Sequence, residues 1–143
     1  MTTNSLSGKN VVIIGGTAGI GLATAQTASG MGANVWAAGR SKTHIENAKR
    51  SSNGSFEIRQ ADTHDVASLE AIFKEVGVID HLVSAAVGGE RTLKPFLEQT
   101  EAQFKAADDK LWGYAKVVRT GAPYLTEDGA ITLVSGSPAR KIR

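Results

Sequence analysis

The sequence contains no cysteine, which excludes disulfide bonds, thiol catalysis and metal sites built on thiolates. Its net charge is only +2 and is scattered apart from a basic cluster at residues 140–143, which gives no support for nucleic-acid binding. No apolar run approaches the length of a membrane span, and residues 1–10 lack the apolar segment of a signal peptide. We therefore expect a cytoplasmic protein with neither a nucleic-acid nor a membrane partner.

The remaining composition is that of an ordinary soluble protein, with 41% hydrophobic and 21% charged residues. A length of 143 residues is sufficient for one hydrophobic core, and no linker divides the chain, so residues 1–143 are predicted to form one domain. The three histidines, His44, His64 and His81, are too dispersed to predict a metal site, and we interpret them as surface or capping residues.

The most informative segment is the glycine-rich turn at residues 15–21, which lies between a β-branched run and a stretch of helical character. A turn in this position is typical of a dinucleotide pyrophosphate site, because the first helical turn offers unpaired N–H groups and the positive end of the helix dipole. Glycines remove the Cβ atoms that would block the turn and the phosphate. The alternative is a structural turn without a nucleotide. The predicted cofactor-binding residues here are Gly15, Thr17, Ala18, Gly19, Ile20 and Gly21.

Predicted strands and helices alternate along the whole chain. The strands are apolar on both faces, which favours a parallel sheet covered by helices on both sides. Right-handed crossovers then predict an α/β fold with a doubly wound parallel sheet of five strands ordered 3-2-1-4-5. The expected strands are 11–14, 34–38, 56–61, 79–86 and 130–134, and the expected helices are 20–31, 42–50, 66–76 and 100–121.

The last of these helices begins at a capping box formed by Thr100 and Gln103. Apolar residues recur along it at helical spacing and predict the face that it buries against the sheet. These residues are Phe104, Ala107, Leu111, Ala115 and Val118.

The second predicted strand ends at Gly39-Arg40-Ser41, and no acidic residue lies between positions 35 and 44. An NAD site usually places a carboxylate here to hold the ribose 2′-hydroxyl, whereas a guanidinium suits a 2′-phosphate. Arg40 and Ser41 therefore predict a preference for NADP(H), with NAD(H) as the alternative cofactor. A solvated arginine without a ligand is the competing interpretation.

Two further segments follow predicted strands at the same end of the sheet. Asp62 and Thr63 follow the third strand, where a carboxylate can accept from an adenine amino group, unless Asp62 or Asp65 simply caps the next helix. The fourth strand continues into small residues that allow close passage of the backbone to a ribose or nicotinamide, or that simply pack beside the first helix. These are Ala85, Ala86 and Val87.

With these motifs in place, the chain resembles the N-terminal Rossmann portion of the classical short-chain dehydrogenases/reductases. The resemblance covers about residues 8–143. It implies binding of NAD(H) or NADP(H), hydride transfer to or from a small alcohol or carbonyl substrate, and a homo-oligomer packed through the 100–121 helix. The residues that carry it are Ile14-Gly15-Gly16-Thr17-Ala18-Gly19-Ile20-Gly21, Gly39-Arg40, Asp62, residues 80–88, Leu111-Trp112-Gly113 and residues 131–137.

The family pattern also implies a catalytic serine after the fifth strand and an asparagine on the preceding helix. The asparagine position holds Lys110, which we keep as a tentative catalytic residue. Matching by the apolar strand residues places Ser135 on the serine position, whereas matching by the preceding glycine places Gly136 there, between Ser135 and Ser137. We favour Ser135 and leave the alternative open.

The family's Tyr-x-x-x-Lys pair is absent, because Tyr114 is followed four residues later by Val118, and Tyr124 by Asp128. The C-terminal strands of the full family fold are also missing, so the chain has the pattern of a truncated enzyme. We therefore expect residues 1–143 alone to bind cofactor without turnover. Two functions remain: an NADP(H)-dependent oxidoreductase represented by part of its chain, or a catalytically silent dinucleotide-binding sensor or interaction domain.

Overall fold

The computed structural model describes residues 5–87 and 93–136 and has the predicted sheet, with five strands in the order β3-β2-β1-β4-β5. All four strand pairs are parallel. The strands are β1 (Asn10–Ile14), β2 (Asn34–Gly39), β3 (Glu57–Gln60), β4 (Ile79–Ser84) and β5 (Leu125–Leu133). The helices are α1 (Gly19–Gly30), α2 (Lys42–Ser52), α3 (Val66–Val76) and α4 (Glu101–Gly121), with short 3₁₀ turns η1 (Phe96–Glu98) and η2 (Ala122–Tyr124).

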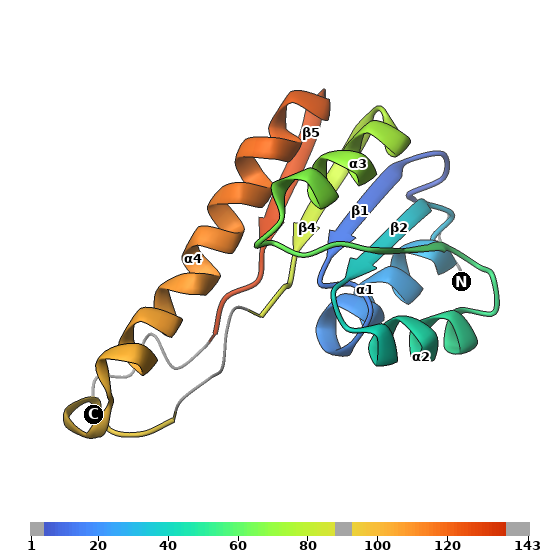
Figure 1. Cartoon of the computed structure of the whole chain (residues 1–143). Helices are drawn as coiled ribbons and strands as arrows, with labels where there is room; N and C mark the ends of the chain where they lie inside the picture. Colours follow the sequence, from blue (N-terminus) through green and yellow to red (C-terminus); the bar gives the residue numbers. More distant parts are fainter. Residues whose placement is uncertain (1–4, 88–92, 137–143) are drawn as a thin grey trace.

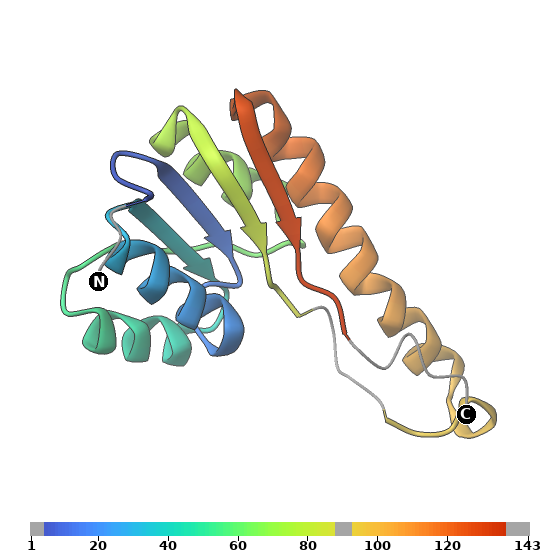
Figure 2. The same ribbon diagram turned by 180° about the vertical axis from the view of Figure 1, so that it is seen from behind.

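The helices form one layer on each side of the sheet, so the molecule has three layers (Figures 1 and 2). Helices α1 and α2 cover one face, where Ala25 and Ile45 pack with Val11 and Ile13 of the central strand. Helices α3 and α4 cover the other, where Phe73 and Val117 meet alternate residues of the same strands. Because β1 and β4 are buried on both faces, they place the glycine turn and the end of β4 at fixed positions beside each other.

Local side-chain contacts account for where three helices begin. The hydroxyl of Ser41 accepts from the backbone N–H of His44 at the start of α2, and the Asp65 carboxylate accepts from Ala67 N at the start of α3. The capping box predicted at Thr100 and Gln103 is present at the start of α4. These contacts satisfy N–H groups that an α-helix leaves unpaired at its first turn.

The predicted buried face of α4 is wrong. Helix α4 instead buries Gly113, Val117 and Gly121, while Phe104 and Leu111 of the predicted stripe are 47% and 66% exposed. The reason is the closeness of the approach: a Cβ at Gly121 would lie 2.5 Å from Leu82 Cδ2. The apolar spacing predicted the wrong face because the helix approaches the sheet through glycines, which have no side chain and so do not appear in an apolar pattern.

Strand β5 starts five residues earlier than predicted, at Leu125 rather than at residue 130. Its first half contains the polar residues Glu127 and Asp128 and lies beside a register shift in β4 between Ile79 and His81. Polar side chains and an irregular register both remove the apolar pattern by which a buried strand is recognised. No helix in the described part of the chain is long and apolar enough to cross a membrane.

Candidate nucleotide-binding site

The glycine turn connects the carboxyl end of β1 to α1 and has almost no space for additional side-chain atoms. Gly15 has φ +83°, and a Cβ there would lie 2.4 Å from Ala86 N. A Cβ at Gly21 would lie 1.9 Å from the carbonyl oxygen of Gly15. The two glycines thus allow the turn to fold back on itself and onto the segment after β4.

Gly19 is in a different position. It also has positive φ, +53°, but among the described residues no atom outside its chain neighbours and its own helix backbone lies within 4 Å of where its Cβ would be. Ala18 at the N-cap of α1 provides no side-chain hydrogen bond, and the first turn of the helix has no acidic residue. The first N–H groups of α1 therefore lack a side-chain cap and face open space, an arrangement suited to a phosphate anion. The residues present fit a dinucleotide pyrophosphate at this point.

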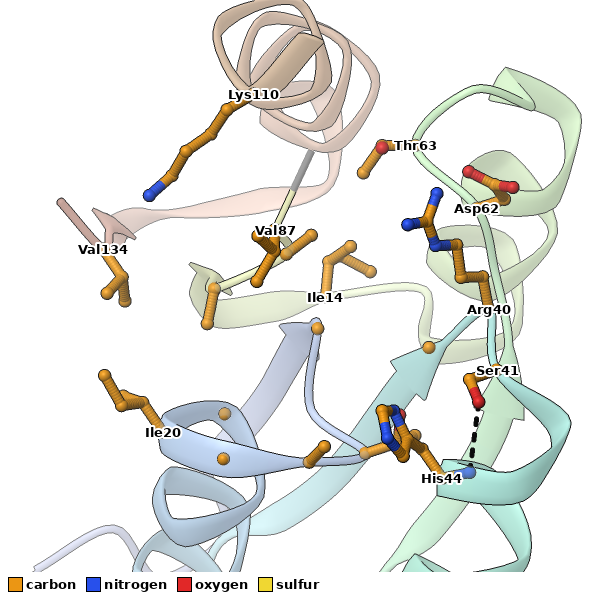
Figure 3. A pocket seen from close by; sticks show the side chains of 18 of the residues that line it. Ile14, Ile20, Arg40, Ser41, His44, Asp62, Thr63, Val87, Lys110 and Val134 are labelled. Carbon is orange, nitrogen blue, oxygen red and sulfur yellow. Dashed lines mark hydrogen bonds between the residues drawn. The ribbon is translucent and has the colours of Figure 1, made fainter. Parts of the chain in front are cut away.

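A cavity of about 910 Å³ extends from this turn across the carboxyl ends of the strands, where ligands of doubly wound sheets bind (Figure 3). All fifteen residues predicted for cofactor binding or catalysis lie along it. From the glycine turn and the strand ends they are Gly15, Thr17, Ala18, Gly19, Ile20, Gly21, Arg40, Ser41, Asp62, Thr63, Ala85, Ala86 and Val87, and from the far side Lys110 and Ser135.

Arg40 and Asp62 face the same part of the cavity from the ends of β2 and β3 (Figure 3). Arg40 is exposed, and its guanidinium is close enough to lower the pKa of Asp62 through its charge. The Ser41 side chain lines the cavity, but its oxygen already accepts the bond that caps α2. Of the two carboxylates considered as caps, Asp65 caps α3, so Asp62 is not needed for that purpose.

Asp62 belongs to a chain of charged groups that the sequence did not reveal. His64 Nδ1 lies 2.8 Å from Asp62 Oδ1, and His64 Nε2 lies 2.8 Å and 2.9 Å from the two carboxylate oxygens of Asp109 on α4. Partial burial opposes ionisation of Asp62, but hydrogen bonds from His64 and the charges of His64 and Arg40 outweigh it and lower the pKa. Hydrogen bonds to Asp62 and then to Asp109 raise the pKa of His64.

The segment after β4 both packs and lines the cavity. Ala85 N donates to the carbonyl of Ile14 at 2.8 Å, which places residues 85–86 directly against the glycine turn. The two interpretations of these small residues, packing beside the first helix and contact with a bound ribose or nicotinamide, are therefore compatible. Ser84, just before them, is fully buried, and its hydroxyl has no hydrogen-bond partner among the described residues.

The two candidate catalytic residues approach the cavity from α4 and from the end of β5. Lys110 extends from α4 toward Val134 (Figure 3), and its Nζ lies 5.4 Å from the ring centre of Tyr114. The Tyr114 hydroxyl donates to the carbonyl of Val134 and so links α4 to β5, and burial raises the pKa of Tyr114. Ser135 and Gly136 both line the cavity, which leaves the choice between them open, and Ser137 lies outside the described residues.

Several lining residues were not predicted. They are Gln99, Gln103, Ala106 and Ala107 at and before the start of α4, and His44 on α2. The capping box located the start of α4, but no sequence signal indicated that this end of the helix extends over the cavity. Within residues 5–87 and 93–136, no group of three or more His, Cys, Asp or Glu side chains is arranged so that it could hold a metal ion.

Comparison with known proteins places this geometry in a family. A family model described as short chain dehydrogenase matches residues 9–141. Among curated proteins, the short-chain dehydrogenase/reductase ATR9 of Stachybotrys chlorohalonatus (strain IBT 40285) is 32% identical over 123 residues, covering 71% of this chain and 48% of the relative. The chain thus spans about half the length of this relative.

Solved structures agree in fold. A short chain dehydrogenase/reductase family protein has a TM-score of 0.79 at 26% identity, covering 95% of this chain and 58% of the other. The MalC reductase/Diels-Alderase from Malbranchea aurantiaca has a TM-score of 0.80 at 27% identity, covering 94% and 59%. A short-chain dehydrogenase/reductase mutant of Serratia marcescens, with a TM-score of 0.79 at 22% identity over 96% and 59%, supports the fold alone.

Proposed function

Because the chain belongs to the short-chain dehydrogenase family, we propose that it forms the dinucleotide-binding part of an oxidoreductase acting on a small alcohol or carbonyl compound. The observation that carries this proposal is the glycine turn, whose uncapped helix N-terminus opens into a cavity at the carboxyl ends of the strands. The bound nicotinamide supplies the chemistry, which is the transfer of a hydride. We place the protein in the cytoplasm.

The proposed roles follow the cavity from the adenine end to the nicotinamide end. Arg40 with Ser41 holds the 2′-phosphate, and Asp62 with Thr63 meets the adenine. The N–H groups of residues 19–21 bind the pyrophosphate, which Thr17, Ala18 and Gly15 allow to approach closely. Ala85, Ala86 and Val87 pass beside the nicotinamide ribose. All of these residues line one cavity.

Only two residues, Ser135 and Lys110, are proposed for catalysis. Both line the cavity, and Lys110 lies across it from Arg40 and Asp62 (Figure 3). In the proposed reaction these two residues hold a carbonyl oxygen or a water. The 143 residues contain no Tyr-x-x-x-Lys, the pair that would move the proton. Positioned acid–base groups typically contribute about 10²–10⁴-fold to a rate, so we propose that residues 1–143 bind nucleotide but do not turn over substrate by themselves.

A second candidate function is a catalytically silent nucleotide sensor or interaction domain. It is favoured by Lys110, which stands where the family pattern has an asparagine. NADPH oxidation by the full-length protein against a panel of aldehydes and ketones discriminates the two. Tight binding with no oxidation supports the sensor, and substrate-dependent oxidation supports the enzyme.

The preferred cofactor is NADP(H), with NAD(H) as the weaker alternative. Arg40→Ala removes the guanidinium proposed to pair with the 2′-phosphate, and we expect it to weaken NADPH binding by about 1–3 kcal/mol while leaving NADH binding nearly unchanged. Arg50→Ala is the matched control, because Arg50 is an exposed arginine of α2 that does not line the cavity. Calorimetric titration of both nucleotides measures the effect. Equal affinity of the wild-type protein for NADPH and NADH contradicts the preference.

We further propose that the protein is a homo-oligomer that associates through α4. The outer face of this helix exposes Leu111 and Trp112, which are 66% and 64% accessible. Large apolar side chains exposed side by side are costly in water and are typical of a protein interface. The occupant that we assign to this face is the same helix of a second copy, as the family resemblance implies.

A further inference from the structure

His64 stands between two carboxylates that come from distant parts of the chain. Its Nδ1 lies 2.8 Å from Asp62 Oδ1 on the turn after β3, and its Nε2 lies 2.8 Å from Asp109 Oδ1 on α4. The side chain is 46% exposed, so both the ring and its bonds are open to solvent. An ionised carboxylate only accepts hydrogen bonds, so both ring nitrogens must carry a proton for both contacts to form. The geometry is therefore that of an imidazolium.

The same histidine fixes how Asp62 presents its carboxylate. Both the His64 ring and the His64 backbone N–H, at 2.9 Å, bond to Oδ1 of Asp62. Within the described residues, Oδ2 of Asp62 receives no recorded hydrogen bond, which leaves it for a donor in the cavity. Next to this contact, Thr63 packs on Gly113, where a Cβ would lie 3.1 Å from Thr63 Oγ1. The β3–α3 turn is thus joined to α4 at two adjacent points.

The charge of this cluster acts on Arg40. The charged groups around His64 are Asp62 on its own turn and Asp109 on α4, and Asp65 nearby is engaged as the α3 cap. Arg40, from the end of β2, acts on Asp62. With His64 protonated the three groups 62, 64 and 109 carry a net charge of −1, and with His64 neutral they carry −2. The second state attracts Arg40 more strongly and repels an incoming phosphate.

We infer that His64 is a positioning and specificity residue, which in its imidazolium form clasps the β3–α3 turn to α4, aims Asp62 at the adenine and leaves Arg40 free for a 2′-phosphate. This inference rests on the proposed nucleotide site. It concerns the difference between the two cofactors, because the pyrophosphate is common to both and only NADP(H) brings the additional phosphate charge next to Arg40.

The proposed effect of His64 on the ratio of NADPH to NADH affinity depends on pH. The raised pKa of His64 means that the imidazolium persists above about pH 6.5, the usual midpoint of histidine. As pH rises through the folded pKa of His64, the ring loses its proton, and the ratio of NADPH to NADH affinity falls. One unit charge acting across several ångströms of screened medium predicts a fall of about two- to five-fold. The 2′-phosphate itself titrates near pH 6, below this window.

The experiment measures the binding of NADPH and NADH between pH 6.5 and 9 in the full-length protein, by nucleotide fluorescence. We expect the falling affinity ratio in the wild-type protein and a flat ratio in His64→Gln, whose amide has no titrating charge. Asp109→Asn retains an acceptor for Nε2 but removes its charge, and is expected to move the fall to lower pH. His44→Gln is the matched control, because His44 also lines the cavity but has no carboxylate partner recorded in the described residues. The fall must survive in that variant.

A second measurement determines the pKa of His64, first in the protein without nucleotide. Magnetic resonance of isotope-labelled histidine, assigned through the signal lost in His64→Gln, gives the His64 pKa of the free protein. We expect a value above 6.5 that NADPH raises further, because linkage requires a ligand favoured by the imidazolium to favour the imidazolium in return. NADH should raise it less.

The outcomes distinguish a failure of the role proposed for His64 from a failure of the proposed nucleotide site. A His64 pKa at or below 6.5 in the free protein overturns the proposal that an imidazolium bridges Asp62 and Asp109, whatever the protein binds. Binding of both nucleotides with the same pH dependence in wild type and His64→Gln overturns the role in specificity and leaves the nucleotide site intact. If the affinity ratio no longer falls with pH in His44→Gln, the effect belongs to His44, and the role of His64 in specificity is overturned. If neither nucleotide binds at any pH, the proposed function fails and the inference fails with it.

Discussion

Gly19 is the residue that separates a structural turn from a binding turn. It has φ +53°, and in the part of the chain that the structure describes no atom beyond its chain neighbours and its own helix backbone lies within 4 Å of where a Cβ would be, so there is room for a side chain. We expect Gly19→Val to abolish nucleotide binding, because its branched side chain would occupy the place proposed for the pyrophosphate. Calorimetric titration with NADPH measures the loss.

The control for this substitution must reproduce its backbone strain. Gly54 also has positive φ, +76°, with nothing within 4 Å, and it does not line the cavity. Both Gly19→Val and Gly54→Val should lose about 1–2 kcal/mol of stability from the left-handed conformation, as urea denaturation would measure. Only the first should lose nucleotide binding. A folded Gly19→Val variant with unchanged affinity would mean that the loop is only a turn.

Individual site residues were predictable where a chemical type follows a strand. Arg40, Asp62 and Ala85 lie at or just after the end of a predicted strand, and parallel strands bring their carboxyl ends to one edge, so their positions in sequence predicted that they lie along one cavity. The role of His64 was not predictable. Its partner Asp109 is 45 residues away, and the contact depends on which side of α4 faces the β3–α3 turn.

At the scale of elements, helix α4 packs closely against the sheet through Gly121. Gly121, its last residue, lies where a Cβ would be 2.5 Å from Leu82 Cδ2 and 3.2 Å from Phe73 Cζ, and both neighbours are fully buried. We expect Gly121→Ala to destabilise the protein by about 1–3 kcal/mol, because the new Cβ would force those fully buried side chains to shift within a packed core. Urea denaturation of the full-length protein is the measurement.

Gly30 provides the comparison, since it is the last residue of α1 and no atom outside its own helix turn lies within 4 Å of where its Cβ would be. Gly30→Ala should be neutral or stabilising by up to about 1 kcal/mol, as helix propensity alone predicts. Equal effects of the two substitutions would show that α4 is not packed as closely as its glycines imply.

Most elements could be predicted, and those that differed share a physical cause. Helix α3 was predicted at its observed bounds because Leu69, Ile72 and Phe73 are both apolar and buried, so periodicity and packing coincide. They do not coincide in α4, where glycines face the sheet and large apolar residues face outward. Early β5 has the same difficulty, since it contains the polar residues Glu127 and Asp128 where the register with β4 shifts. A hydrophobic pattern predicts burial only where burial is achieved by large side chains.

At the scale of the whole molecule, the outer face of α4 predicts an assembly. We expect Trp112→Glu to shift the full-length protein toward a smaller species in light scattering, because a buried carboxylate at the centre of an interface is costly. Stability of the folded subunit should change little, since Trp112 is 64% exposed and the sheet side of the helix is formed by other residues. Lys105→Glu, a change of charge at an exposed residue of the same helix, is the control. An unchanged mass for Trp112→Glu would assign the interface elsewhere.

The pH dependence of the folded molecule gives the last prediction. Because the pKa of His64 is raised in the folded protein, its contribution to stability is fully present below about pH 6.5 and is lost as pH rises through the folded pKa. In that window the native state holds a proton that the unfolded chain has released, so the free energy of unfolding falls with rising pH. The pKa of Asp62 is lowered, so its contribution is present above about pH 3.8 and is lost as pH falls through the folded value.

Together these two signs predict that the cluster of Asp62, His64 and Asp109 contributes most between about pH 4 and 6.5. Urea denaturation of wild type and His64→Gln across pH 5 to 9 tests this directly. The difference in unfolding free energy between them should be largest near pH 6 and should shrink as pH rises through the folded pKa of His64, because the wild-type imidazole then also becomes neutral. Its slope should stay below that of one whole proton, since the partly exposed ring is screened by solvent. A constant difference across the range would mean that His64 contributes through its shape alone and that the two carboxylates do not hold its proton.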